Sequence, residues 1–151
     1  MRDDEIMMTN PTEGDLPATA VALQQLRDVR RGLIHLHKTL LDAERLRYER
    51  VNGRVEGGTL LQLLIHDPWF GWLRPLSELI VQIDERLDAD EPTTANAVTA
   101  LVDQVRALLK PGEGSEDVFE ENYFAALQQT PDVVMAHRAV TLLIKPPGTE
   151  P

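Results

Sequence analysis

Apolar residues recur at alternating spacings of three and four along the segment from about residue 18 to residue 52. Because an α-helix turns once about every 3.6 residues, this spacing places them on one face of a helix. Charged residues occupy the opposite face, and Lys38 and Asp42, like Arg45 and Glu49, are four residues apart, which lets them pair. The pattern predicts one long amphipathic helix. Its apolar stripe consists of Leu26, Val29, Leu33, Leu36, Leu40 and Ala43.

Two further segments repeat this helical period. The second predicted helix covers residues 59–87 and opens on a capping box, in which Thr59 and Gln62 satisfy backbone groups of the first turn. The third begins near residue 93 or 94 and ends at Leu109, before a proline and two glycines. The apolar seam of the second helix consists of Trp69, Leu73, Leu76, Ile80, Ile83 and Leu87.

The stretch HDPWFGWLRP interrupts the second predicted helix with two prolines. Asp67 followed by Pro68 is typical of a helix start, so residues 59–66 form either a separate short turn or the first part of a kinked helix. Pro75 lacks the N–H that would bond to the carbonyl of Gly71, and a glycine there offers no side chain to obstruct a bend. We therefore predict a kink near Gly71.

The fourth predicted helix begins at Ser115, whose hydroxyl is expected to cap it. It breaks at Thr130 and Pro131 and continues to Ile144. The part from residue 133 to residue 144 is rich in β-branched residues, so a β-strand competes there. Four apolar stripes joined by short loops predict an all-α fold: an antiparallel up-and-down four-helix bundle with a kinked second helix and a broken fourth helix.

Length and composition indicate one domain. A chain of 151 residues suffices for one hydrophobic core and is short for two ordinary domains. Residues 1–17 and 146–151 mix charged residues, proline and glycine without a period, so we expect two disordered tails around a single helical-bundle domain at 18–145. The absence of cysteine excludes disulfides, thiolate metal ligands and thiol nucleophiles, and it suits a reducing compartment.

The charge distribution bears on partners. A net charge of −10 argues against nucleic acid as a partner, although eight of the fifteen Lys and Arg residues lie between residues 27 and 54. Either this asymmetry is neutralised within the fold or across a homo-oligomer, or residues such as Arg30 and Arg47 belong to an anion-binding stripe. No signal peptide and no apolar run near the roughly 20 residues of a membrane span is present, so we expect a cytoplasmic protein without a membrane partner.

Both tryptophans of the chain lie in HDPWFGWLRP. Trp69 falls on the apolar seam and reads as a core anchor, while Trp72 flanks the seam next to Arg74. The favoured interpretation is that both rings are core residues that anchor the kinked helix, and the alternative is that one lies at an interface, where tryptophan with arginine is typical. The favoured function is therefore a non-enzymatic helical binding or interaction module, which self-associates or binds a partner protein through Trp69, Trp72 and Arg74 or through the basic first helix.

The histidines suggest an alternative function. His66 is expected to face the bundle interior, with His37 on the first helix and His137 on the fourth. If the three met at one level, with Glu44 as base or fourth ligand, they would suit Zn or Fe in a metal-binding enzyme or sensor. Against this, the chain has no Glu-x-x-His and no His-x-x-x-His pair. No cofactor is therefore expected under the favoured interpretation.

Two segments carry a resemblance to known families. LLDAERLRYERVNGR and HDPWFGWLRPLSELIVQIDERLDADEP resemble a family of small, uncharacterised bacterial all-helical proteins, and the similarity continues to VVMAHRAVTLL. This resemblance implies a helical fold and assigns no site residue. The histidine shortly before a tryptophan, here His66 before Trp69, also resembles DinB-like metal-binding four-helix bundles. The paired histidines that those proteins place on a later helix are missing, since only His137 is present there.

Overall fold

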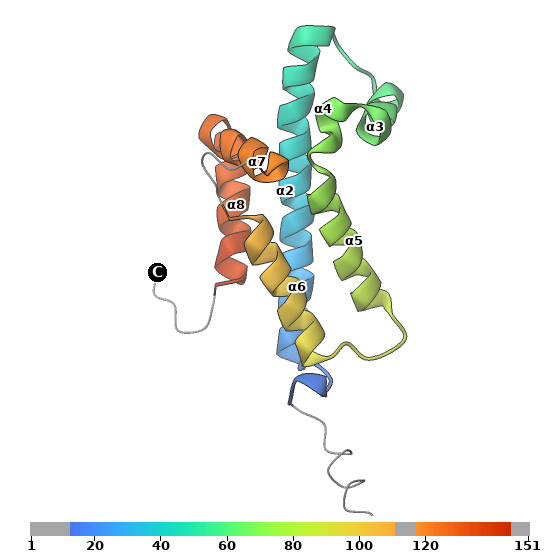
Figure 1. The fold of residues 1–151 in the computed structure, drawn as a ribbon, viewed down its shortest axis with the longest axis vertical. Helices are drawn as coiled ribbons and strands as arrows, with labels where there is room; N and C mark the ends of the chain where they lie inside the picture. The colour runs from blue at the N-terminus through green and yellow to red at the C-terminus, as the bar shows by residue number, and fades with distance from the viewer. Residues whose placement is uncertain (1–12, 111–116, 146–151) are drawn as a thin grey trace, which may run out of the picture.

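The computed structural model describes residues 13–110 and 117–145, and this part of the chain is all-helical, as predicted. It contains seven α-helices where the sequence predicted four, so the predicted count is wrong. A short 3-10 turn, η1 (Glu13–Asp15), comes before them (Figure 1). The helices are α2 (Ala20–Asn52), α3 (Gly57–His66), α4 (Pro68–Gly71), α5 (Arg74–Asp88), α6 (Ala95–Leu108), α7 (Val118–Gln129) and α8 (Pro131–Leu143).

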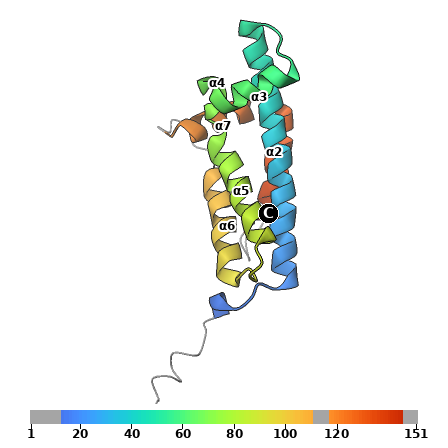
Figure 2. The same cartoon turned by 90° about the vertical axis from the view of Figure 1, so that its right-hand side faces the viewer.

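The longest helix, α2, has 33 residues and forms the axis of the molecule. Helices α5, α6 and α8 pack along it, and the four run alternately up and down (Figures 1 and 2). Helix α7 lies across the others and packs on α8, while α3 and α4 lie beside the C-terminal half of α2. The segment where a strand competed in the sequence is the helix α8.

The core follows the stripe predicted for the first helix up to residue 40. Leu26, Val29, Leu33, Leu36 and Leu40 are buried, whereas the predicted sixth member, Ala43, is only half-buried and Glu44 takes the buried position instead. The partners of this stripe come from α4–α8 and the residues beside them. They are Phe70, Trp72, Leu73, Leu76, Leu79, Ile83, Val98, Leu101, Val102, Val105, Leu109, Phe119, Tyr123, Val133, Ala136, Val140 and Ile144.

Gly32 marks the closest approach of α2 to α8. A Cβ atom added at this position would lie 3.0 Å from Cγ2 of Val140, which is tighter than ordinary van der Waals contact. The two helices therefore pack closely here, and a residue larger than glycine would require the Val140 side chain to shift by a few tenths of an ångström. Gln25 reinforces the same contact, because its side-chain amide donates to the backbone oxygen of Leu143 at 2.9 Å.

The second predicted helix consists of three helices. The predicted start at Asp67 is confirmed, since its carboxylate accepts a hydrogen bond from the backbone N–H of Trp69 at 2.8 Å and Pro68 opens α4. The predicted kink at Gly71 is instead the end of α4. Pro75 lies in the first turn of α5, where no helical hydrogen bond is lost.

The predicted capping box is wrong. Helix α3 begins at Gly57, two residues earlier than expected, with Glu56 at the N-cap and no side-chain hydrogen bond there. Thr59 and Gln62 are both exposed within α3. Thr59 and Gln62 have the spacing of a capping box. Gly57 and Gly58 before them already belong to α3, so Thr59 does not occupy the N-cap.

The fourth predicted helix is α7 followed by α8, and the predicted break at Thr130 and Pro131 separates them. Helix α7 is capped by Asp117, whose carboxylate accepts from the backbone N–H of Glu120 at 3.0 Å. The predicted cap, Ser115, lies outside the described residues. Because of this break, α7 and α8 point in different directions. Helix α7 lies across the bundle and does not form one long helix with α8 (Figure 1).

Residues 13–17, which the sequence placed in a tail, pair with the connection between α5 and α6. The backbone N–H of Ala18 donates to the backbone oxygen of Thr93 at 2.8 Å, and the backbone N–H of Ala95 donates to the backbone oxygen of Leu16 at 2.9 Å. Between these two hydrogen bonds, Pro17 forms an antiparallel bridge with Thr94. Leu16 and Pro17 thus contact the helical part of the chain, and the predicted limits of the domain stay a prediction. The rest of the predicted tails, 1–12 and 146–151, lies outside the described residues.

Candidate functional site

The second half of α2 and the short helix α4 bring together several residues that the sequence singled out. We call Glu44, Arg47, Tyr48, Trp69 and Phe70 the Arg–Trp cluster. Glu44 is 6% exposed, and its carboxylate accepts a hydrogen bond from Nη1 of Arg47 at 2.7 Å. The guanidinium carbon of Arg47 lies 5.8 Å from the centre of the Trp69 ring. Arg47 therefore bridges a buried carboxylate and an aromatic face, as a planar guanidinium is suited to do.

Aromatic contacts fix α4 on α2. The ring of Tyr48 meets that of Trp69 edge to face, with the centroids 5.4 Å apart, and lies 5.5 Å from that of Phe70. Such contacts add about 0.5–1.5 kcal/mol beyond the burial of area. Phe70 is buried, and the predicted seam omitted it. The sequence signal for the burial of Phe70 was its position between two tryptophans. The stretch is too short to show a helical period, so the seam did not include this residue.

Both tryptophans pack on the core, and Trp72 is the more deeply buried of the two. Trp72, expected beside the seam, is 8% exposed and its ring lies 5.6 Å from that of Phe119. Trp69, expected in the core, is half-buried under Arg47. The indole N–H groups of both are buried, and no described residue accepts a hydrogen bond from them. Trp72 lies in the turn between α4 and α5, where a single helical phase drawn through residues 59–87 no longer assigns side-chain directions.

The connection between α2 and α3 is fastened to the end of α2. The backbone N–H of Val55 donates to Oε2 of Glu49 at 2.8 Å, and Arg45 donates to the backbone oxygen of Val55. Arg45 also pairs with Glu49 at 3.3 Å, as the spacing in the sequence predicted. The hydrogen bond from Val55, and then Arg45, lower the pKa of Glu49 below its ordinary value. These bonds hold the loop that delivers α3.

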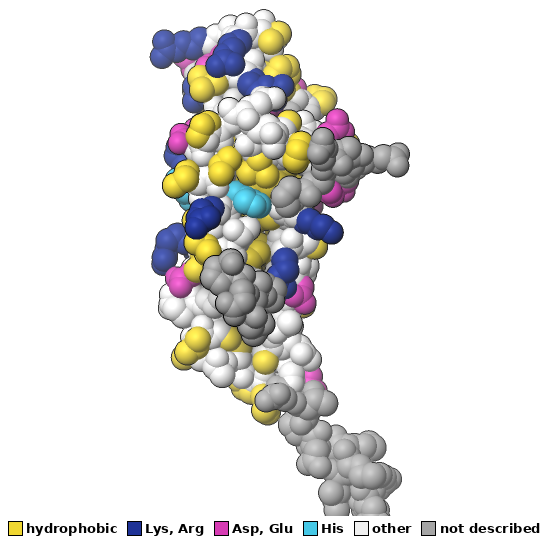
Figure 3. All heavy atoms as spheres, turned by 90° about the vertical axis from the view of Figure 1, so that its left-hand side faces the viewer, with side chains coloured by type: hydrophobic (Ala, Val, Ile, Leu, Met, Phe, Trp, Pro, Cys, Tyr) yellow, Lys and Arg dark blue, Asp and Glu magenta, His cyan; other side chains and the backbone are white. Residues whose placement is uncertain are grey.

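The end of the molecule that carries α3 exposes apolar and cationic side chains together. Leu61 and Ile65 on α3 are 56% and 52% exposed. The last turns of α2 add further exposed residues, and Lys or Arg side chains gather at this end (Figure 3). We call this region the apical surface. It consists of Leu46, Arg47, Arg50, Val51, Arg54, Leu61 and Ile65.

Two other predicted interface residues lie elsewhere. Arg30 forms an ion pair with Asp84 of α5, so this cation is neutralised within the fold. Both side chains are partly exposed, which limits the contribution of such a pair to about 1 kcal/mol or less. Arg74 is exposed at the start of α5.

The structure does not assemble the predicted metal ligands. Among the described residues, no three His, Asp or Glu side chains lie in a group that could hold a metal ion. His66 is exposed, so its predicted inward direction is wrong, because α3 lies on the outside of the bundle. His37 is half-buried on α2, and its burial lowers its pKa. His137 lies on α8, and the carboxylate of Glu44 is paired with Arg47. The Zn or Fe site stays a prediction.

Comparison of the chain with protein-family models, with curated proteins and with solved structures gave no match. The resemblances to a family of small bacterial helical proteins and to DinB-like bundles therefore stay predictions. Within the two described ranges, no helix is long and apolar enough to cross a membrane.

Proposed function

We propose that this chain is a non-enzymatic helical interaction module that binds a second copy of itself through the apical surface. In this proposal α2, α5, α6 and α8 act as an antiparallel up-and-down bundle that presents the surface. The absence of cysteine suits the cytoplasm as its location. The observation that carries the proposal is the position of α3, a helix of ten residues with four leucines and one isoleucine and without a fully buried residue.

Helix α3, with the sequence GGTLLQLLIH, has apolar residues on both sides. Leu60, Leu63 and Leu64 pack against the core, while Leu61 and Ile65 face outward. A helix on the surface of a monomer ordinarily carries polar residues on its outer face. Exposed apolar side chains on such a helix are typical of a surface that is covered by a protein partner.

The arginines of the apical surface have the exposed carboxylate of Glu56 beside them, which allows a second copy as that partner. In a two-fold dimer the same surface of both chains meets, so a surface of one sign would repel itself. Alongside the exposed Arg50 and Arg54, this end also exposes Asp42 and Glu56. Arginine next to tryptophan, as in Arg47 over Trp69, is enriched at the centre of protein interfaces.

Size-exclusion chromatography with light scattering tests this proposal. The protein is expected to elute with twice the chain mass of 17.0 kDa, and a Leu61→Lys/Ile65→Lys variant with the mass of one chain. Val81→Lys is the matched control, because Val81 is a similarly exposed apolar residue on α5. A single-chain mass for the unmodified protein over the whole accessible concentration range, or a dimer that survives the double substitution, would refute the proposal.

A further inference from the structure

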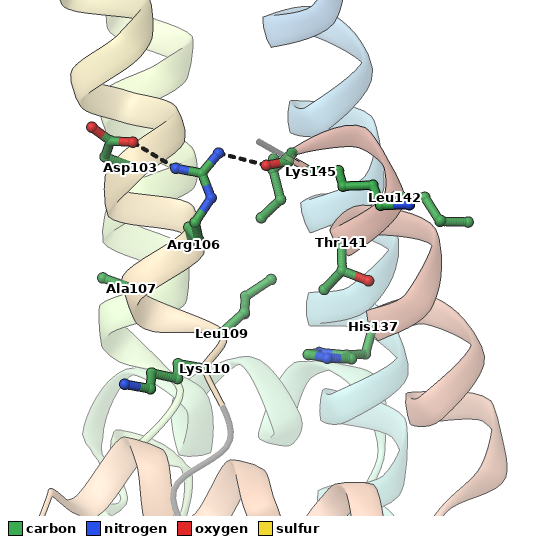
Figure 4. Close-up of a pocket in the computed structure, with 10 residues that line it drawn as sticks. Asp103, Arg106, Ala107, Leu109, Lys110, His137, Thr141, Leu142 and Lys145 are labelled. Carbon is green, nitrogen blue, oxygen red and sulfur yellow. Dashed lines mark hydrogen bonds and ion pairs between the residues drawn. The ribbon is translucent and has the colours of Figure 1, made fainter. Parts of the chain in front are cut away.

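Helix α8 lies on the opposite side of α2 from α3 (Figure 1), and residues of α6 and α8 line a groove between these two helices. Both helices pack on α2, and between them lies a cavity of about 650 Å³ that opens to the surface (Figure 4). We call it the α6–α8 groove. Its volume falls within the range of about 300–1,000 Å³ that is usual for small-molecule sites.

The wall of the groove is apolar and its rim is cationic. Leu109 and Ile144 are buried at its base, and Leu142 is exposed at its edge. Three cationic residues line it together with a single carboxylate, that of Asp103. Figure 3, which views the molecule from the side of α8, shows Lys and Arg around hydrophobic side chains on this face. The local charge is opposite to the net charge of −10 of the chain.

Arg106 is held in place across the groove. Its Nη1 donates to Asp103 at 2.6 Å, and its Nη2 donates to the backbone oxygen of Ile144, which links α6 to the end of α8 (Figure 4). Its Nε is buried, and none of the described residues accepts a hydrogen bond from it. A guanidinium has five N–H donors, so this fixed cation retains hydrogen-bonding capacity for an anion.

His137 adds a neutral donor to the wall of the groove. Its Nδ1 lies 2.6 Å from the hydroxyl oxygen of Tyr123, which is fully buried. Burial raises the pKa of Tyr123 and lowers the pKa of His137, so the tyrosine O–H donates to an unprotonated Nδ1. The neutral ring then carries its proton on Nε2. His137 lines the groove on α8, opposite Leu109, the residue that follows α6 (Figure 4).

We propose that the α6–α8 groove binds a linear apolar carboxylate of the free fatty-acid class. The carboxylate binds at Arg106, with Lys145 adding positive charge at the rim, and the alkyl chain lies along Leu109 toward His137, with Leu142 at the outer edge. Charge complementarity selects the anion, and the apolar wall selects the hydrocarbon. A sugar or a nucleotide would require far more polar partners than this wall offers. This site is separate from the apical surface and does not depend on self-association.

Isothermal titration calorimetry with sodium dodecanoate below its micellar concentration tests the proposal. We expect saturable binding of one ligand per chain and no binding of dodecyltrimethylammonium, which has the same tail and the opposite charge. Lys145→Glu and Leu142→Glu each weaken binding about tenfold, whereas Lys145→Arg keeps it. Neither replaced side chain is buried, so both variants are expected to fold, which circular dichroism checks. The matched control, Val81→Glu on α5, binds as the unmodified protein does.

Three results would overturn the proposal: no saturable binding of dodecanoate, equal binding of the cationic amphiphile, or unchanged affinity in both Lys145→Glu and Leu142→Glu. Amide shifts on titration locate the ligand, and they are expected to cluster on α6 and α8. The Leu61→Lys/Ile65→Lys variant separates the two proposals, because it removes self-association and is expected to leave binding of dodecanoate unchanged.

Discussion

The two halves of α2 are built differently. Up to residue 40, the helix buries an unbroken apolar stripe against the helices that run along it. Beyond residue 40, Glu44 is its one buried residue, and α2 holds α4 and the loop before α3 through ion pairs, aromatic contacts and hydrogen bonds. The first half thus stabilises the bundle by removing apolar area from water, while the second positions a surface. Because both halves belong to one continuous helix, the packed first half fixes the position of the second half and of the surface that it carries.

The largest effect is expected from shortening the stripe of the first half. Leu33→Ala removes a fully buried side chain and is expected to lower the free energy of unfolding by about 2–5 kcal/mol, measured by urea denaturation. Leu46→Ala makes the same change at an exposed position of the second half and is expected to alter it by about 0.5 kcal/mol or less. Equal losses in the two variants would contradict the difference between the halves.

A smaller effect is expected from breaking the Arg–Trp cluster. Arg47→Met leaves the buried carboxylate of Glu44 without its partner, which is expected to cost about 1–3 kcal/mol of the free energy of unfolding. Tryptophan emission should shift to longer wavelength as Trp69 loses its cover. The double variant Glu44→Gln/Arg47→Met removes the unpaired charge and should recover part of the loss. A double variant no more stable than Arg47→Met would show that the charge is not the cause.

The smallest effect concerns the fastening of the loop. Because the pKa of Glu49 is lowered from its ordinary value of 4.5, its stabilising contribution is present above pH 4.5 and is lost as the pH falls through the lowered pKa. The difference in free energy of unfolding between the protein and Glu49→Gln should therefore shrink on acidification. Urea denaturation over a pH series measures it. A difference that is constant with pH would exclude the ionised carboxylate as the acceptor of the Val55 N–H.

Local chemistry explains what the sequence predicted correctly. The stripe from Leu26 to Leu40 has no proline or break, so a single helical phase assigns all of its members. The starts at Asp67 and Pro131 follow from a proline in the first turn, which needs no neighbour from elsewhere in the chain. The i, i+4 pairs of α2 likewise depend on helix geometry alone.

The errors arise where the helical phase is interrupted. One seam drawn through residues 59–87 crosses two breaks, so it assigned Trp72 to the flank and His66 to the interior. The α6–α8 groove was not predicted for another reason. Arg106 and His137 are far apart in the sequence, and their distance depends on how α6 and α8 pack on α2.

The close approach at Gly32 links the core to the α6–α8 groove. An alanine at position 32 would place a methyl group 3.0 Å from Cγ2 of Val140, so this side chain of α8 would have to move by a few tenths of an ångström. Helix α8 forms one wall of the groove, so the size of the residue at position 32 acts on an element of the groove from a position that does not line it.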